Sequence, residues 1–244
     1  MIRIVRPALP HQVADRLPPL RDEIAAAKRA DRVRTARAAW KRSTVRKAVH
    51  APLREVLAGM APGYERCMYC GDSQGTDIDH FEPLARNPLR TFDWLNHLLA
   101  CSTCNSNLKR DRFPLDAKNK PLLIDPTTED PFDHLLLTPA LGVYHALTEK
   151  GRETISVCGL NRPVLTNGRV QARRVVLLCL RKWATGDDQD RHEAVLTVQG
   201  QPFADVCQAL LRLALSPGAG RVFEDTPDAL ALLHDEELRA ALLL

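Results

Sequence analysis

Residues 67–110 read CMYCGDSQGTDIDHFEPLARNPLRTFDWLNHLLACSTCNSNLKR, and this stretch decides the fold. It contains two CxxC pairs, Cys67 with Cys70 and Cys101 with Cys104, with 30 residues between them. Zinc prefers four tetrahedral ligands, and a CxxC turn lets two thiolates reach one ion. The spacing therefore predicts a structural zinc site of four cysteines. A redox-active CxxC is the alternative, but two pairs so close together make coincidence improbable, and disulfides are rare in the cytosol.

Three further cysteines, Cys158, Cys179 and Cys207, stand alone in the sequence. The last two lie in the apolar runs VVLLCL and FADVCQALL, where a free cysteine behaves as a small hydrophobic residue. We expect all three to pack in the core. The odd total of seven cysteines then requires no reactive thiol, and it argues against a fully paired disulfide framework.

Polar residues of a particular kind lie inside the cysteine frame. The first pair is followed by Asp79-His80 with Pro83 nearby, then by Trp94-Leu-Asn96, and the second pair runs directly into Asn105. In this order the residues over about 64–114 resemble the HNH endonuclease motif, also called the ββα-metal nuclease. The resemblance implies an α+β fold: a ββα-metal HNH core stabilised by the four-cysteine zinc site, embedded in mostly α-helical N- and C-terminal regions.

The resemblance also implies a role for each of these residues in phosphodiester hydrolysis. His80 maps to the general base, a task that suits imidazole because its ordinary pKa lies near physiological pH. Asn96 maps to the residue that holds this histidine in place. Asp79 and Asn105 map to oxygen ligands of a catalytic metal, for which hard donors favour Mg2+ or Mn2+.

The basic residue after CxxCN departs from the family pattern, which often places lysine three positions after the asparagine. Here Lys109 follows Asn105 by four positions, which leaves Asn107 as an alternative ligand, although we favour Asn105 because it directly follows Cys104. We expect Lys109 and Arg110 to contact phosphate groups of a nucleic acid. His97 occupies a position that is usually apolar in relatives, so we expect no catalytic role for it.

Charge is distributed unevenly along the 244 residues, whose overall net charge is +4. Residues 1–60 carry 14 Lys and Arg against 5 Asp and Glu, a local net charge of +9, which leaves −5 for the rest. A basic segment on a weakly acidic body fits a contact with nucleic acid, and a solvated helix face rich in arginine fits equally well. We divide the chain into a basic helical region (1–60), the HNH core with its zinc site (61–115), and a region of loop, β-hairpin and helices (116–244).

The expected secondary structure follows from proline, glycine and apolar spacing. We expect residues 1–19 to be irregular, 20–60 to form one or two helices broken near Pro52, and 77–83 to form a strand. Residues 114–142 indicate an ordered loop, and 142–157 indicate a β-hairpin that turns near Lys150-Gly151. Helices are expected over 168–185, 203–215 and 227–243. The acidic and histidine residues of 125–134 fit a capped loop better than a second site.

The composition excludes several classes of protein. With 45% hydrophobic and 26% charged residues, the chain can bury its own core and is not disordered. No stretch reaches the roughly 18 uncharged apolar residues of a membrane span, and the first 16 residues carry charges instead of a signal core. These features predict a cytoplasmic protein without a membrane partner.

Outside the core, several segments extend the resemblance to about residue 180. They are the basic N-terminus with its prolines, KRDRFP after the second cysteine pair, LIDPTTEDPFDHL, and GLNRP before an arginine-rich helix. Together they resemble bacterial HNH proteins of anti-phage defence, namely the HNH component of Septu and the retron-associated HNH group. The resemblance implies a DNA endonuclease that works with an ABC/SMC-like ATPase. Two alternatives stay open: a non-catalytic zinc module that binds nucleic acid or protein, and an HNH nuclease directed at RNA.

Overall fold

The computed structural model describes residues 1–243. Its N-terminal segment folds into short helices: α1 (His11–Ala14), α2 (Leu17–Ala26), α3 (Arg32–Lys41), α4 (Ser43–Val45), a π-helical turn η2 (Arg46–His50) and α5 (Ala51–Met60). The expected basic helices are present, but the irregular region ends at Pro10 instead of residue 19. Pro18 and Pro19 fall in the first turn of α2, where a missing N–H costs no hydrogen bond.

The predicted break near Pro52 was wrong. The chain stays helical from residue 43 to 60, and the break lies at Arg42, whose backbone is extended (φ −60°, ψ 130°). A proline ring clashes with the carbonyl four residues earlier in a regular helix interior. The wider π-helical turn directly before Pro52 places this proline at the start of α5 and avoids that clash.

The central unit consists of two strands and one helical turn. Strands β1 (Asp77–His80) and β2 (His97–Ala100) pair antiparallel, with Asp77 opposite Ala100 and His80 opposite His97. A π-helical turn η5 (Thr103–Lys109) follows the second cysteine pair. The expected strand over 77–83 is confirmed in its first half, and the order strand, strand, helical turn gives the ββα arrangement of an α+β fold.

The C-terminal region differs from the prediction at its hairpin. Strands β3 (Leu135–Thr138) and β4 (Val143–Ala146) form the hairpin, whereas the expected second strand belongs to helix α6 (Glu149–Cys158). The Thr148 hydroxyl caps this helix by accepting a hydrogen bond from the Gly151 N–H. The helix then buries Thr154 and Val157, so packing on one face overrides their β propensity.

Within residues 1–243, six helices follow α6 and pack mainly against one another. They are α7 (Pro163–Thr185), α8 (Asp188–Gly200), α9 (Ala204–Leu213), α10 (Ala219–Val222), α11 (Pro227–Leu232) and α12 (Glu236–Leu242). The expected helices near 168–185 and 203–215 are confirmed. The helix expected over 227–243 is divided, because the Asp235 side chain caps a new start at α12. Helix α8 was not predicted; it is largely polar and buries only Ala194 and Val198.

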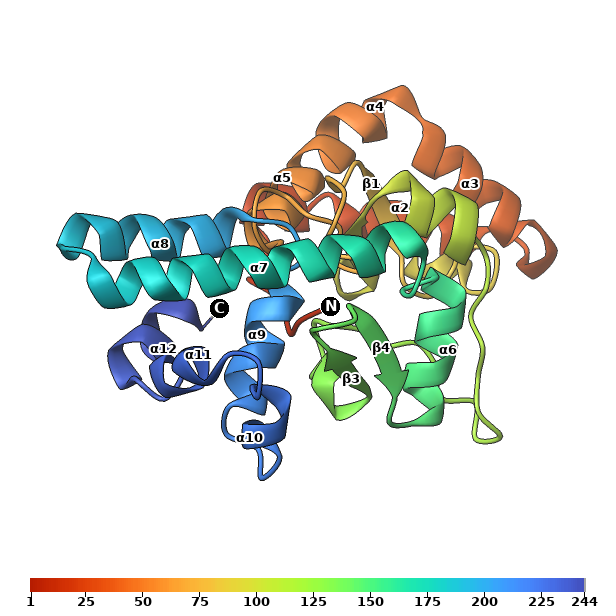
Figure 1. Cartoon of the computed structure of the whole chain (residues 1–244). Coiled ribbons are helices and arrows are strands. Elements are labelled where there is room, and N and C mark those ends of the chain that lie inside the picture. Colours follow the sequence, from red (N-terminus) through yellow and green to blue (C-terminus); the bar gives the residue numbers. More distant parts are fainter. Residues whose placement is uncertain (244) are drawn as a thin grey trace.

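Two groups of buried apolar residues hold the molecule together. The N-terminal helices gather around Ile24, Ala36, Ala39 and Leu53, and Phe92 from the central unit joins this group. The larger group joins the region of the four paired cysteines, the β3–β4 hairpin and the C-terminal helices. Cys158 and Cys207 are buried in it, whereas Cys179 is partly buried and packs against its edge. Figure 1 shows α3, α4 and α5 as an arch beside β1, with the long helices α7 and α8 side by side below it. None of the helices within residues 1–243 combines the length and apolar character needed to cross a membrane.

Candidate active site and zinc centre

The four cysteines of the two CxxC pairs meet at one point. Their sulfur atoms all lie within 4.8 Å of one another, Cys70 Sγ is 3.9 Å from Cys101 Sγ, and all four residues are buried free thiols. Tetrahedral zinc with Zn–S bonds near 2.3 Å places sulfur atoms about 3.8 Å apart. The donor set and its spacing therefore fit a structural zinc ion.

The backbone of the first pair forms the tight turn that such a site needs. Gly71 has a φ of +69°, and its N–H donates to the Cys67 carbonyl over 2.9 Å. A positive φ is easily adopted by glycine because it has no Cβ. Met68 N–H donates to Leu99 O over 2.9 Å, so the turn is joined to β2. The cysteine cluster thus joins the turn that precedes β1 to the end of β2 and to η5.

A cleft of about 380 Å³ lies beside β1 and η5. It is lined by Asp79, His80, Asn105 and Arg110, four of the residues predicted for the site, and by Trp40 of α3. Asn96 does not line it. Asn107 does not line it either, which agrees with the preference for Asn105. The structure therefore brings His80, Asp79 and Asn105 together at one cleft, and their roles as base and metal ligands stay predictions.

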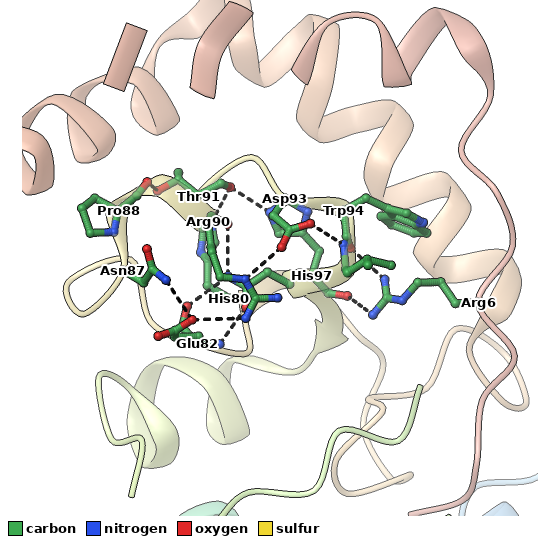
Figure 2. A network of polar contacts seen from close by, with 12 residues as sticks. Arg6, His80, Glu82, Asn87, Pro88, Arg90, Thr91, Asp93, Trp94 and His97 are labelled. Atoms are coloured by element: carbon green, nitrogen blue, oxygen red, sulfur yellow. Dashed lines mark hydrogen bonds and ion pairs between the residues drawn. The ribbon is translucent and has the colours of Figure 1, made fainter. Parts of the chain in front are cut away.

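The ring of His80 is oriented by a backbone carbonyl. His80 Nε2 lies 3.0 Å from the carbonyl oxygen of Thr91. Figure 2 marks this contact with a dashed line. A carbonyl only accepts hydrogen bonds, so Nε2 carries the proton and Nδ1 keeps its lone pair. Burial lowers the pKa of His80 to about 4, against a smaller opposing effect of the Thr91 carbonyl. The imidazole is therefore neutral at pH 7 and able to accept a proton at Nδ1.

Asn96 acts on the loop that follows β1 and not on the cleft. Its Oδ1 accepts from the Glu82 N–H at 2.8 Å, and its Nδ2 donates to Glu82 O at 3.0 Å and to Arg90 O at 3.1 Å. The side chain is fully buried, so these bonds form in a dry environment. Asn96 thereby holds the loop between His80 and Thr91 in place, and its role in positioning a catalytic base stays a prediction.

A ring of polar contacts surrounds this loop (Figure 2). The Glu82 carboxylate accepts from Asn87 at 3.1 Å and pairs with Arg90 at 3.2 Å. Arg6 donates to the carbonyls of Trp94 and His97 at 2.9 and 3.0 Å, which joins the irregular N-terminal segment to the start of β2. The loop that carries Thr91 is therefore held from two sides.

Asp79 is 2% exposed and has two close partners. Lys109 Nζ lies 3.1 and 3.0 Å from its two carboxylate oxygens, and the Tyr69 hydroxyl donates to it over 2.6 Å. Burial raises the pKa of Asp79, while the ammonium and the hydroxyl oppose that shift. Tyr69 was missed by the sequence argument, although it lies inside the first CxxC pair.

Lys109 does not have the surroundings expected of a phosphate contact. Its side chain is fully buried, and Nζ also donates to His80 O over 2.7 Å. A surface phosphate cannot reach an ammonium that is enclosed and already bonded in this way. The prediction of Lys109 as a phosphate contact is therefore corrected: this residue neutralises Asp79. Arg110 is exposed on the cleft and remains a predicted phosphate contact.

The amide of Asn105 has a defined orientation. Its Nδ2 donates to Asp77 Oδ2 over 3.1 Å, and the Ser106 hydroxyl donates to the same oxygen over 3.3 Å. Because an ionised carboxylate cannot donate, the nitrogen must face Asp77 and the amide oxygen faces away. Within residues 1–243, no group donates a hydrogen bond to that oxygen. Asp77 was not predicted, and it acts by orienting Asn105.

An aromatic cluster, also missed by the sequence argument, covers His80. The Trp40 ring lies 4.5 Å from the His80 ring in an edge contact and 3.8 Å from the His50 ring. His97, which faces His80 across the two strands, is fully buried and lies 5.1 Å from it. In the sequence Trp40 was only an apolar position on a basic helix, and nothing indicated which residue it would contact.

The residues between Asp125 and His134 form a capped loop. Asp125 accepts from the Thr127 N–H and hydroxyl, and Asp130 caps the turn at Phe132. His134 bonds to Glu129 and Thr148. In the part of the chain that the structure describes, the four cysteines are the one group of metal-binding side chains that meet closely. Residues 125–134 therefore form a capped loop, as the sequence predicts.

The fold and the site define a class of protein. Residues 67–111 match the family model "HNH endonuclease", the segment that carries both cysteine pairs and the cleft residues other than Trp40. The chain carries an HNH domain of the four-cysteine type. It is also similar to the Septu protein PtuB of Bacillus mycoides (strain KBAB4), with 23% identity over 143 residues, 46% of this chain and 48% of that protein. The chain thus spans about half the length of the curated relative that it matches.

Proposed function

We propose that this chain is a metal-dependent HNH endonuclease that hydrolyses phosphodiester bonds of DNA. One observation carries the proposal: a neutral imidazole, oriented by Thr91, lies in the same cleft as the oxygen donors Asp79 and Asn105. Hydrolysis requires a base, oxygen ligands for a cation, and a cationic contact for phosphate. His80, the Asp79–Asn105 pair and Arg110 supply these three in order.

In the proposed reaction, His80 Nδ1 accepts a proton from a water molecule whose oxygen attacks phosphorus. The P–O bond to the leaving 3′ oxygen then breaks, and that oxygen takes a proton from solvent. The Thr91 carbonyl stabilises the imidazolium that forms, because it accepts from Nε2 in both protonation states. Arg110 at the rim of the cleft supplies a fixed positive charge for the phosphate.

Asp79 and Asn105 are suited to a hard divalent cation. Asp79 offers a carboxylate, and Asn105 offers an amide oxygen that accepts no hydrogen bond within residues 1–243. Oxygen donors of this kind fit Mg2+ or Mn2+. When bound, the ion would neutralise charge on the phosphate and on the leaving oxygen. Lys109 already supplies one positive charge to Asp79, so the cation would share this carboxylate with the ammonium.

Similarity to the Septu protein PtuB supports a biological setting for this activity. We propose that the chain acts in bacterial anti-phage defence, in the cytoplasm, together with an ABC/SMC-like ATPase. The basic region 1–60 would bind DNA, residues 61–115 would cut it, and part of 116–244 would bind the partner. Size-exclusion chromatography with and without the product of the neighbouring gene tests that partner; separate elution at high protein concentration would reject it.

The enzymatic proposal is tested by incubating purified protein with plasmid DNA and Mg2+ or Mn2+. We expect wild type to nick the plasmid and His80→Ala to be inactive, while the matched control His134→Ala, outside the cleft, stays active. Equal nicking by wild type and His80→Ala would show that His80 is not the base. If neither cuts DNA but wild type cuts RNA, the substrate is RNA. If wild type cuts neither, even with its partner, a binding module replaces the enzyme.

A further inference from the structure

Positive charge is concentrated next to the cleft, on the segment from residue 28 to 47. These twenty residues contain nine Lys and Arg and a single Asp. Part of this charge is locally satisfied: Arg34 pairs with Asp31, and Arg42 pairs with Glu23. We define the basic face as Arg37, Lys41, Arg46 and Lys47. All four are exposed, and none makes a side-chain hydrogen bond or ion pair within residues 1–243.

The basic face belongs to the same helices that cover His80. Arg37 precedes Trp40 by three positions, so the two share one side of α3. Arg46 lies in η2 with His50, the ring that stacks on Trp40 at 3.8 Å. Burial is the main cause that lowers the pKa of His50 to about 4, and the charge of Arg46 contributes to it. Arg37 and Arg46 thus lie on the same helical segments as Trp40 and His50, and Trp40 contacts the His80 ring.

The helices that carry these charges are firmly attached to the nuclease unit. Ala36, Ala39, Val45 and Val49 are buried in one apolar group with Phe92, and Ile78 of β1 packs against it. Figure 1 shows α3 and α4 as part of the arch beside β1. Basic residues on a flexible tail would only raise the local concentration of a polyanion. Basic residues on a rigidly packed helix also fix the direction in which the polyanion runs past the cleft.

Arg110 gives the cleft positive charge from the direction of η5. A phosphate chain that reaches His80 would therefore have Arg110 beside it and could continue along the basic face. One arginine can hold a single phosphate group, whereas four further cations over α3 and η2 match several successive phosphates. This extended arrangement suits a long, regularly charged ligand such as a duplex.

We propose that the basic face of α3 and η2 binds the backbone of the DNA duplex and forms one wall of the catalytic cleft. This inference rests on the proposed function and adds the path of the substrate. The helical region 1–60 is then a part of the active site, and Trp40 is the residue that joins the binding wall to the base.

The test measures binding without cleavage. The His80→Ala protein is titrated with a short fluorescent DNA duplex over a range of salt concentrations. We expect Arg37→Gln with Arg46→Gln to lower affinity roughly tenfold at moderate salt and to reduce the slope of log Kd against log salt by about two. Lys118→Gln with Lys120→Gln is the matched control, since it removes the same charge from an exposed loop. We expect the control to change neither quantity.

Each outcome decides the inference separately from the enzymatic proposal. Wild-type affinity in the Arg37–Arg46 variant, or an equal loss in the control pair, overturns the assignment. Binding confined to RNA also overturns it. The thermal midpoint of each variant must match that of the parent, and Arg37→Lys with Arg46→Lys must restore affinity, which excludes a folding defect. If His80→Ala and wild type nick DNA alike, the proposed mechanism fails. The slope of log Kd against log salt then still tests whether the basic face binds DNA.

Discussion

His80 and His97 direct their Nε2 atoms at the same acceptor. The two nitrogens lie 3.0 and 2.9 Å from the carbonyl oxygen of Thr91, and the residues face each other across β1 and β2. One carbonyl has two lone pairs, so it can accept from both rings at once. His97 therefore holds the carbonyl that orients His80, so this buried histidine affects the proposed base without contacting a substrate itself.

The first prediction concerns the tautomer of His80. Because the Thr91 carbonyl requires a donor, we expect His80 at pH 7 to be neutral with its proton on Nε2. A two-bond 1H–15N correlation spectrum distinguishes this form from the Nδ1–H tautomer and from imidazolium, and His80→Gln identifies the signal. A proton on Nδ1, or a charged ring at pH 7, would contradict the proposed role of His80 as base.

The sequence was informative where chemistry depends on side-chain type and spacing. Two CxxC pairs predict a metal site because four thiols so spaced can bind one zinc ion. Asp79-His80 and Asn105, singled out from the sequence, do line one cleft. Thr91 could not be found in this way, since its contribution is a backbone carbonyl that any residue carries. Lys109 shows a related limit: its charge is visible in the sequence, but its burial depends on the packing of η5 against β1.

Tertiary packing explains the errors in secondary structure. The run Thr154-Ile155-Ser-Val157 has strong β propensity, yet a cap at Thr148 and a buried face make it helical. Trp40 is informative in the opposite sense. It lies within residues 20–60, where the sequence predicts helix, but its contact with His80 joins segments forty residues apart in the chain, which apolar periodicity cannot predict.

The second prediction is a loss of stability in mild acid. Burial lowers the pKa values of His50 and His80 to about 4 and that of His97 well below 6.5. Between pH 6.5 and 4 the unfolded chain binds protons at these residues and the native protein does not, so stability falls as pH falls. For His80 alone the loss amounts to about 3 kcal/mol.

Urea unfolding at pH 7 and pH 5 checks this dependence. His50→Phe removes one titrating ring and retains an aromatic partner for Trp40, so we expect a smaller difference between the two pH values. The effect of His50 should be less than that of a fully buried ring, since this residue is only about half buried. An identical pH dependence in the variant and in wild type would exclude His50 as a contributor.

The third prediction separates two adjacent basic residues. Lys109→Met removes the partner of a buried carboxylate, and we expect a loss of about 3–5 kcal/mol in the free energy of unfolding. The double variant with Asp79→Asn should recover part of this loss because no charge remains buried. Arg110→Gln, on the exposed neighbour, should change stability by less than about 0.5 kcal/mol. Equal effects at the two positions would refute the buried ion pair.

The fourth prediction concerns metal content. We expect one zinc ion per chain by mass spectrometry under native conditions and loss of cooperative unfolding after treatment with a strong chelator, because the four thiols join the turn before β1 to the end of β2 and to η5. Cys104→Ser should reproduce the effect of the chelator. Cys179→Ser, on α7 outside the group, serves as the control and should retain zinc. A metal-free protein with an unaltered thermal midpoint would show that the site is dispensable.

The last prediction tests whether Asn96 acts through the loop. Asn96→Ala leaves two carbonyls and one N–H without their partner, and we expect a cost of about 2–4 kcal/mol because each buried polar group loses a hydrogen bond. A purely structural defect would lower stability alone. If Asn96 positions the loop that ends at Thr91, the variant should show faster amide exchange over residues 82–91. Its kcat for nicking should also fall, while its affinity for DNA, measured in the His80→Ala background, is retained.

Asn87→Ala is a suitable comparison, since it removes one half-exposed bond to Glu82 in the same loop. Unchanged exchange in the loop, together with lost activity, would instead assign Asn96 to the chemistry itself.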